Sequence, residues 1–201
     1  MLTQLDIRQI VADRVGREWC LFVDRDGVIN RQIVDDYVRG WADFEWLPGA
    51  RDALRKLREW APHLVVVTNQ QGVGKGLMSI GDVTGIHDHI QAELAQDGVA
   101  VNGFQVCPHL ESRHCSCRKP QPGLVLDWLA DHPSVDPSLS IVVGDSPSDM
   151  ELAQNVATAV DRCVSIGIGG RASVVGFANA AFNSLWDFAV AVGHAREELG
   201  S

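Results

Sequence analysis

Three features are missing from this sequence of 201 residues, and each absence excludes a class of protein. No stretch approaches the roughly 18 consecutive apolar residues that a membrane-spanning helix requires. The N-terminal segment, residues 1–19, mixes charged residues into its apolar positions, which excludes a secretory signal. Internal repeats, low-complexity tracts and long linkers are also absent. We therefore expect a cytoplasmic protein with a single domain over residues 1–201, in which residues 1–18 form a helical N-terminal extension.

Basic residues are outnumbered by acidic ones. The chain has 17 Lys and Arg residues against 26 Asp and Glu residues, which gives a formal net charge of −9. This balance argues against a general nucleic-acid-binding or anionic-membrane-binding protein, although it permits a local basic pocket. Hydrophobic residues make up 46% and charged residues 21%, proportions that exclude a disordered chain. The composition favours a globular enzyme, either a monomer or a weak oligomer.

Cysteine is also infrequent, and its distribution is uneven. Cys20 and Cys163 lie in short apolar runs and are predicted to be small buried residues in strands. The other three cysteines crowd into residues 107–117. The total is five, an odd number, in a chain with a large core and no export signal, so we do not expect a disulfide framework.

Apolar runs alternate with helical patterns along the chain. The runs predict strands at residues 20–23, 64–67, 104–106, 141–143 and 163–166. Residues with a spacing of three to four predict helices at 50–60, 82–95, 123–130, 150–156 and 184–197. This alternation predicts an α/β fold with a doubly wound parallel sheet. Ligands bind at the carboxyl edge of such sheets, so the polar residues after the strands should lie together there.

Two carboxylates follow the first predicted strand in the segment Asp24-Arg25-Asp26-Gly27. They could be turn residues that accept hydrogen bonds from backbone amides. Alternatively they are a nucleophile and its acid/base partner, with Gly27 allowing a sharp turn beneath a bound anion. Thr68 and Asn69 end the second strand and have the same two interpretations, turn residues or ligands of phosphoryl oxygens.

Asp145 and Asp149 follow the fourth predicted strand. Asp149 could be a residue of the first helical turn, with Ser148 as the helix cap. Asp145 ends an apolar strand, where a carboxylate needs a cation, and Mg²⁺ held by oxygen ligands is the natural one.

Two basic segments are candidates for substrate contacts. The segment Gly72-Val73-Gly74-Lys75-Gly76 does not match the nucleotide-binding loop, which needs an earlier Gly and a Ser or Thr after the Lys. It is predicted to be a flexible loop facing the substrate, with Lys75 either a substrate contact or a solvated side chain. Arg118 and Lys119 could be a surface patch, but the prolines that follow restrict the backbone and favour an anion site.

Three cysteines and a histidine lie close together in the sequence. Cys107, His109, Cys115 and Cys117 form a Cys₃His set, which is enough for a closed tetrahedral Zn²⁺ site with a structural role. The alternative is a loop with free thiols. His114 has the wrong spacing for a ligand. Zinc would hold residues 107–117 in shape and thereby place the basic pair that follows.

The order of these motifs resembles the haloacid dehalogenase (HAD) superfamily of phosphohydrolases. The resemblance rests on Asp24-x-Asp26-Gly27, Thr68-Asn69, Lys119 and Gly144-Asp145-x-x-x-Asp149. It implies that Asp24 is the nucleophile and Asp26 the general acid and base. It also implies that Mg²⁺ is held by Asp24, the main-chain carbonyl of Asp26 and Asp145, with Asp149 behind them. Thr68, Asn69 and Lys119 would stabilise the transferred phosphoryl group.

A narrower resemblance joins Cys-Pro-His, Cys-x-Cys-Arg-Lys-Pro and Thr-Asn-Gln to two phosphatase groups, one for histidinol phosphate and one for D-glycero-D-manno-heptose 1,7-bisphosphate. Tyr37-Val38, the segment 72–76 and Pro120-Gln121-Pro122-Gly123 look more like the heptose group. Gln71 departs from the small residue usual there. The heptose group implies removal of a 7-phosphate in carbohydrate metabolism such as lipopolysaccharide synthesis, with Arg118, Gln70 and Lys75 as substrate contacts.

The same resemblance leaves two other functions open, hydrolysis of histidinol phosphate or another small phosphosugar, and an inactive zinc-stabilised binding module. The spacing between motifs is too short for a large cap domain. We therefore expect loops alone to cover the cleft, at residues 31–46, 70–76 and 107–117.

Overall fold

The computed structural model describes residues 5–200, so residues 1–4 of the predicted N-terminal extension lie outside the described part of the chain. Six parallel strands form one sheet in the order β3-β2-β1-β4-β5-β6. The strands are β1 (Cys20–Val23), β2 (His63–Asn69), β3 (Gly103–Cys107), β4 (Ile141–Gly144), β5 (Val164–Ile168) and β6 (Ala180–Phe182). The strand order reverses between β1 and β4, which is where such sheets form a ligand crevice.

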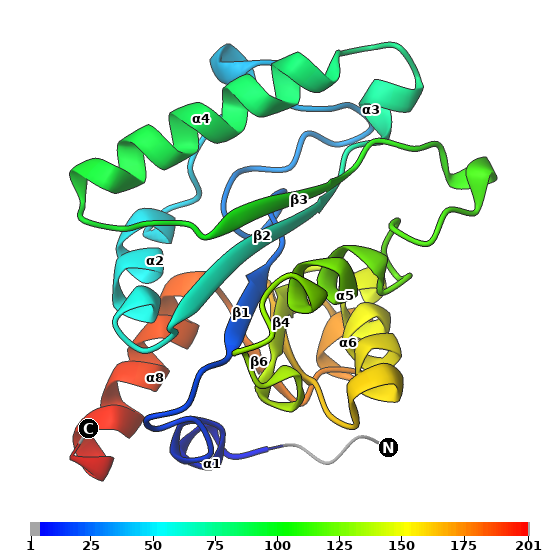
Figure 1. The fold of residues 1–201 in the computed structure, drawn as a ribbon. Coiled ribbons are helices and arrows are strands. Elements are labelled where there is room, and N and C mark those ends of the chain that lie inside the picture. The colour runs from blue at the N-terminus through cyan, green and yellow to red at the C-terminus, as the bar shows by residue number, and fades with distance from the viewer. Residues whose placement is uncertain (1–4, 201) are drawn as a thin grey trace.

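Helices cover both faces of the sheet (Figure 1). The α-helices are α1 (Ile7–Ala12), α2 (Ala50–Arg58), α3 (Gln71–Gly74), α4 (Ile80–Gln96), α5 (Gly123–Ala130), α6 (Pro147–Val160), α7 (Ala172–Val175) and α8 (Leu185–Leu199). Short 3-10 helices are η1 (Trp41–Asp43), η2 (Glu111–Arg113) and η3 (Pro137–Leu139). The alternation predicted from the sequence, and the α/β class, are confirmed.

Successive residues of each strand point to opposite faces and so supply two separate cores. Leu21 and Val23 of β1 join the larger cluster of buried side chains, to which α2, α4 and α8 contribute. Cys20 and Phe22 join the second cluster, with residues of α5 and α6. Strands buried on both faces explain why the sequence shows continuous apolar runs rather than alternation.

Several elements differ from the predictions. Strand β6 and the four-residue helices α3 and α7 were missed, because segments this short carry little periodicity. Helix α6 begins at Pro147 rather than at residue 150. Cys163 is buried as expected, but it precedes β5 instead of lying in it.

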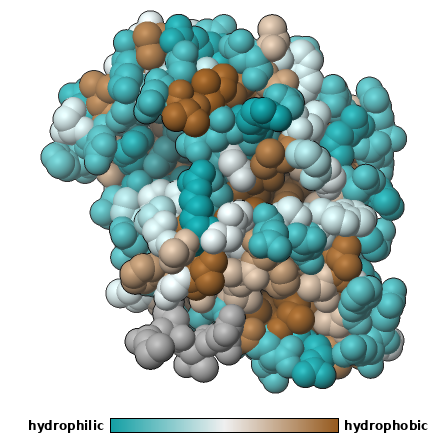
Figure 2. Space-filling model, turned by 180° about the vertical axis from the view of Figure 1, so that it is seen from behind, coloured by the Kyte–Doolittle hydropathy of each residue, from teal (hydrophilic) through white to brown (hydrophobic). Residues whose placement is uncertain are grey.

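The N-terminal helix α1 packs against α8 at the C-terminal end of the chain. Asp6 caps α1 by accepting a hydrogen bond from the Arg8 amide, and Ile10 and Val11 are fully buried. Helix α1 thus lies within the segment expected to be a helical extension and comprises six of its residues. None of the helices within residues 5–200 has the length and hydropathy needed to cross a membrane. The face seen in Figure 2 is mostly hydrophilic, with hydrophobic residues scattered between.

Candidate active site

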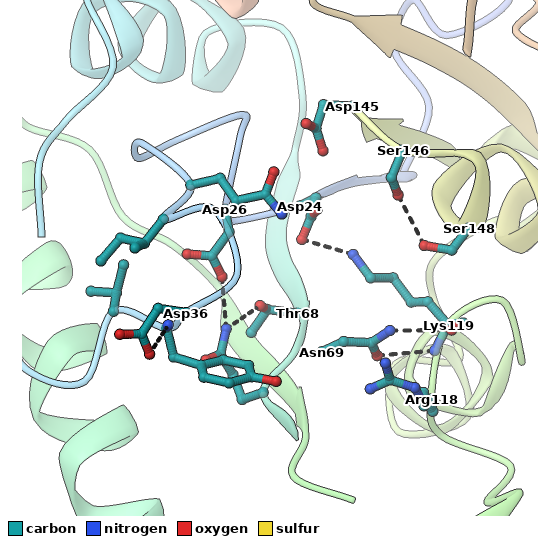
Figure 3. A pocket seen from close by; sticks show the side chains of 15 residues that line it. Asp24, Asp26, Asp36, Thr68, Asn69, Arg118, Lys119, Asp145, Ser146 and Ser148 are labelled. Carbon is teal, nitrogen blue, oxygen red and sulfur yellow. Dashed lines mark hydrogen bonds and ion pairs between the residues drawn. The ribbon is translucent and has the colours of Figure 1, made fainter. Parts of the chain in front are cut away.

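A pocket of about 250 Å³ lies at the carboxyl edge of the sheet, where β1, β2 and β4 end. Eight of the predicted catalytic, substrate-binding and magnesium-binding residues line it, and Figure 3 shows side chains converging there from separate segments. The lining residues are Asp24, Asp26, Gln32, Ile33, Asp36, Tyr37, Val38, Thr68, Asn69, Gln70, Arg118, Lys119, Asp145, Ser146 and Ser148. Parallel strands thus bring together side chains that are distant in the sequence.

Lys119 is the cation at the base of this pocket. Its Nζ lies 2.7 Å from Oδ1 of Asp24 and 2.7 Å from Oδ1 of Asp149, and it also donates a 3.1 Å hydrogen bond to the carbonyl of Val67. Burial alone would lower the pKa of Lys119, but the charges of Asp149 and Asp24 more than offset it and raise the pKa above its ordinary value. The ammonium is therefore charged, although its side chain is only 3% exposed.

Each oxygen of the Asp149 carboxylate has a different partner. Oδ1 receives the Lys119 ammonium, while Oδ2 accepts hydrogen bonds from the amide and hydroxyl of Ser146 at 3.2 and 2.6 Å. Ser146, not Ser148, is therefore the cap of α6, and Asp149 completes a capping box. Asp149 is therefore a residue of the first turn of α6 and also an ion-pair partner of Lys119.

Three carboxylates come together beside Lys119. One oxygen from each of Asp24, Asp145 and Asp149 lies within 4.8 Å of the others. Burial and the charge of Asp149 raise the pKa of Asp24, although Lys119 opposes this, and they raise the pKa of Asp145 to about 6. Lys119 and Arg171, whose Nη1 lies 3.4 Å from Oδ2 of Asp145, supply two positive charges against these three carboxylates, so the ionised cluster has a net negative charge. A small hard cation with oxygen ligands such as Mg²⁺ fits this set of donors.

Gly27 is required at this point of the chain for two reasons. Its φ of +90° lies in the region that L side chains rarely adopt, and a Cβ at this position would collide with the Asp145 carboxylate. The glycine thus lets the segment after β1 approach the segment after β4. This close approach sets the spacing of the carboxylate cluster.

Asp26 lies in a different environment from Asp24. Its carboxylate accepts hydrogen bonds from Asn30 Nδ2 at 2.9 Å, from Gln70 Nε2 at 2.8 Å and from the Arg25 guanidinium. Burial would raise the pKa of Asp26, but the charge of Arg25 and these hydrogen bonds lower it. The pKa values of the two aspartates of the first motif are therefore shifted in opposite directions, because their charged neighbours differ.

Arg25 was not singled out in the sequence, yet its side chain is fully buried beside the pocket. Nη2 lies 3.1 and 3.0 Å from the two oxygens of Asp26, and Nη1 lies 3.3 Å from Nε2 of His87 in α4. The sequence contained one indication that Arg25 is buried. If the alternation of side chains along β1 continues past its end, position 25 points to the same buried face as Leu21 and Val23. The indication for His87 was weaker, because it is a single polar residue on the buried side of helix α4.

Thr68 and Asn69 end β2 and differ in what they contact. Asn69 accepts a 3.0 Å hydrogen bond from the Lys119 amide and donates a 3.1 Å bond to the Lys119 carbonyl, so it holds the backbone of that residue. Thr68 Oγ1 accepts a 2.8 Å hydrogen bond from Gln70 Nε2, which also reaches Asp26. Gln70 was expected from the resemblance alone, and the structure places it between these two residues.

Arg118 and Lys75, the two other basic candidates, differ in position. Arg118 lines the pocket, and its buried Nη1 has no hydrogen-bond partner among residues 5–200. Lys75 is exposed and does not line the pocket, but its Nζ lies 5.3 Å from the ring centroid of Tyr37, which does. Arg118 therefore belongs to the pocket itself. Lys75 is connected to the pocket only by its contact with the ring of Tyr37.

Residues 71–74, expected to be a flexible loop, form the short helix α3 instead. A Cβ on Gly74 would be 2.9 Å from the backbone of Pro108 and Leu110, so this glycine serves close packing against the cysteine-rich loop. Gln71 joins two segments, because its amide donates to the Tyr37 hydroxyl at 3.5 Å and accepts from the Glu111 amide at 2.8 Å.

The four predicted zinc ligands lie together. The Sγ atom of Cys117 is 3.3 Å from that of Cys107, 3.4 Å from that of Cys115 and 3.2 Å from Nδ1 of His109. Cys107 is buried at the end of β3. Three sulfur atoms and one imidazole nitrogen at these separations fit a tetrahedral metal ion with no open position.

Loops cover the pocket, as expected, and no large cap domain is present within residues 5–200. The expected loops contribute unequally. Residues 32–38 supply one wall, whereas the segment 70–76 supplies only Gln70. The cysteine-rich loop itself does not line the pocket, but Arg118 and Lys119, which directly follow it in the chain, do.

Comparison with known proteins agrees with this geometry. Residues 22–164 match the family described as polynucleotide kinase 3 phosphatase. The chain is 68% identical over 191 residues to D-glycero-alpha-D-manno-heptose-1,7-bisphosphate 7-phosphatase of Mycobacterium tuberculosis, covering 95% of this chain and 100% of that protein. It is 32% identical to the corresponding beta-named phosphatase of Photorhabdus laumondii, covering 86% of this chain and 94% of that protein.

A solved structure shows the same fold with ligands. The D,D-heptose 1,7-bisphosphate phosphatase from B. bronchiseptica, complexed with magnesium and phosphate, superposes with a TM-score of 0.76 at 29% identity. The match covers 89% of this chain and 99% of that one. The chain is therefore a phosphatase and belongs to the D-glycero-D-manno-heptose-1,7-bisphosphate 7-phosphatase family of the HAD superfamily.

Proposed function

We propose that this phosphatase removes the 7-phosphate of D-glycero-α-D-manno-heptose 1,7-bisphosphate through an aspartyl-phosphate intermediate on Asp24. The observation that carries the proposal is the position of Asp24, at the end of β1, inside the pocket and 2.7 Å from the charged Lys119. The α anomer is chosen because relatives at 68% identity are named for it, while the beta-named relatives are 32–39% identical.

Asp24 acts as the nucleophile. Its carboxylate oxygen attacks the phosphorus atom in line, the bond from phosphorus to the sugar oxygen breaks, and Asp26 gives that oxygen a proton. Asp26 then takes a proton from water, which attacks the phosphoryl group on Asp24 and releases inorganic phosphate. Asp24 must be ionised to attack phosphorus, and a cation held by Asp24 and Asp145 would lower the raised pKa of Asp24.

Asp24, Asp145 and the main-chain carbonyl of Asp26 are the residues that would hold Mg²⁺, with Asp149 behind them. When bound, the ion neutralises carboxylates that would otherwise repel the phosphate. The excess negative charge of the cluster supports this assignment, as does the magnesium in the B. bronchiseptica structure.

The remaining pocket residues orient the substrate. Lys119 and Thr68 stabilise charge on the phosphoryl oxygens, and Asn69 holds Lys119 in place through its backbone. Arg118 has an unpaired buried nitrogen and is assigned to the second phosphate or to a sugar hydroxyl. Gln70 orients Asp26, and Lys75 acts at the rim through Tyr37.

Zinc is assigned to Cys107, His109, Cys115 and Cys117 with a structural role. The loop connects directly to Arg118 and Lys119, so the order of the loop determines the placement of both cations. We assign the enzyme to the cytoplasm, where it acts on a small phosphosugar as a monomer or a weak oligomer.

Substitution of the nucleophile tests this proposal. Asp24→Asn should remove turnover of the heptose bisphosphate while the thermal unfolding curve and zinc content stay close to those of the wild type. Asp52→Asn, an exposed change in α2, is the matched control and should keep full activity. Substantial steady-state phosphatase activity in Asp24→Asn would contradict the assignment.

The substrate is tested separately by comparing kcat/KM for both heptose anomers, histidinol phosphate and other phosphosugars. The α-heptose bisphosphate should give the largest value. A larger value for histidinol phosphate would leave the chemistry intact and replace the substrate.

A further inference from the structure

The buried contact between Arg25 and His87 has no place in the mechanism above. His87 lies in α4, and its ring stacks on Phe104 of β3 with centroids 4.4 Å apart and planes 13° apart. Its Nε2 faces Nη1 of Arg25 at 3.3 Å, and both residues are buried. An ordinary core would place an apolar side chain here, so a polar pair next to the pocket calls for an explanation.

The direction of this hydrogen bond follows from the chemistry of the two groups. A guanidinium can only donate, so Nε2 of His87 must be the acceptor and the ring must be neutral. Burial and the charge of Arg25 lower the pKa of His87 to about 3, which agrees with a neutral ring at physiological pH. His87 therefore supplies a fixed acceptor rather than a charge.

We propose that His87 is a positioning residue for the general acid: it holds the Arg25 guanidinium, which in turn fixes the carboxylate of Asp26. This inference rests on the proposed role of Asp26. His87 has no direct contact with the pocket and acts only through Arg25.

The geometry of Arg25 shows why an acceptor behind it matters. Its Nη2 lies 3.1 and 3.0 Å from the two oxygens of Asp26, and its Nε has no partner among residues 5–200. Because the guanidinium is planar, a bond to Nη1 from the opposite side fixes the angle at which Nη2 meets the carboxylate. Without His87, a second buried nitrogen would lack a partner, and the group could turn away from Asp26.

Asp26 depends on this support because its side chain is partly exposed, at 23%, on the pocket side. Asn30 and Gln70 bind its oxygens from other directions. Proton transfer requires the carboxyl group within hydrogen-bonding distance of the leaving oxygen, so a small rotation lowers the rate.

Two substitutions separate this role from packing. His87→Phe keeps an aromatic ring against Phe104 and removes the acceptor, whereas His87→Gln offers an amide oxygen as a replacement acceptor. His89→Phe is the matched control, because His89 lies on the same helix with its ring stacked on Trp41 at 4.9 Å and has no contact with Arg25.

The readout is kcat/KM for two substrates on the same preparation, the heptose bisphosphate and 4-nitrophenyl phosphate. The value of kcat/KM reports the steps up to and including phosphoryl transfer to Asp24. An alkoxide needs a proton to leave, but 4-nitrophenolate does not, so only the sugar phosphate depends on Asp26 in that step. Partial unfolding would lower both values by one factor and leave their ratio unchanged.

We expect His87→Phe to lower kcat/KM for the sugar phosphate by about 10–100-fold, with little change for the nitrophenyl ester. His87→Gln should recover much of the loss, and His89→Phe should match the wild type. Equal losses on both substrates, or no loss on either, would overturn the inference. Failure of the aspartyl-phosphate mechanism is a different result, because it appears as activity in Asp24→Asn.

Discussion

The ammonium of Lys119 lies 2.7 Å from the carboxylate of Asp24, although Asp24 directly follows β1 and Lys119 lies between β3 and α5. Asn69 holds Lys119 beside Asp24, because it accepts a hydrogen bond from the Lys119 amide and donates one to the Lys119 carbonyl. Lys119 also follows Cys117 by two residues, so one short segment connects the Cys/His cluster to the ion pair with Asp24.

Replacing Lys119 by Met should lower kcat by about 10²–10³, because a charged donor to the phosphoryl oxygens is lost. The substitution also leaves Asp24 and Asp149 close together without their shared cation, so the free energy of unfolding should fall by a few kcal/mol, on the order of 3–5. Urea unfolding with and without Mg²⁺ measures the second effect. Lys56→Met in α2 is the control and should change neither quantity.

Cys115→Ala should remove bound zinc, because the metal site loses one of its four ligands. It should also impair catalysis indirectly, because the loop that precedes Arg118 is then less ordered. Elemental analysis should give close to one zinc per wild-type chain and little in the variant. Cys163→Ala, at a buried thiol outside the cluster, should retain zinc. A wild-type protein purified without chelator and found free of zinc would refute the metal assignment.

His87 should make stability depend on pH between its ordinary pKa of 6.5 and the folded-state value of about 3. In this range the unfolded chain binds a proton that the folded chain does not, so the free energy of unfolding decreases as the pH falls. The slope from this one group is at most about 1.4 kcal/mol per pH unit. The contribution of His87 is the difference between the wild type and His87→Gln when the free energy of unfolding is plotted against pH. Parallel curves for the two proteins would contradict the prediction.

Arg118→Ala should raise KM for the heptose bisphosphate about tenfold with a smaller change in kcat, because its contact lies away from the transferred phosphate. The 7-monophosphate should show a smaller increase if the second phosphate is the partner. Arg113→Ala, an exposed change in η2, is the control on the same loop. An equal increase for both substrates would assign Arg118 to a sugar hydroxyl instead.

The elements that the sequence predicted are those with a strong local pattern. Buried parallel strands such as β1 and β4 appear as apolar runs, and α5 was predicted with its observed bounds, Gly123–Ala130. The three residues of β6 and the four of α3 are too short to show a period, so their structure depends on contacts with distant segments. The cap of α6 was misassigned because Ser146 and Ser148 are both good cap residues, and only the backbone conformation distinguishes them.

The sequence by itself determined the fold class, the carboxylates at the strand ends and the cluster of three cysteines and one histidine, because residue type, spacing and strand direction fix these features locally. Only the tertiary structure decided that Arg25 is buried, that His87 of a distant helix accepts its hydrogen bond, and that Lys75 lies outside the pocket lining. Burial and charge environment arise from the packing of segments far apart in the chain, and no local pattern records which side chains will face one another.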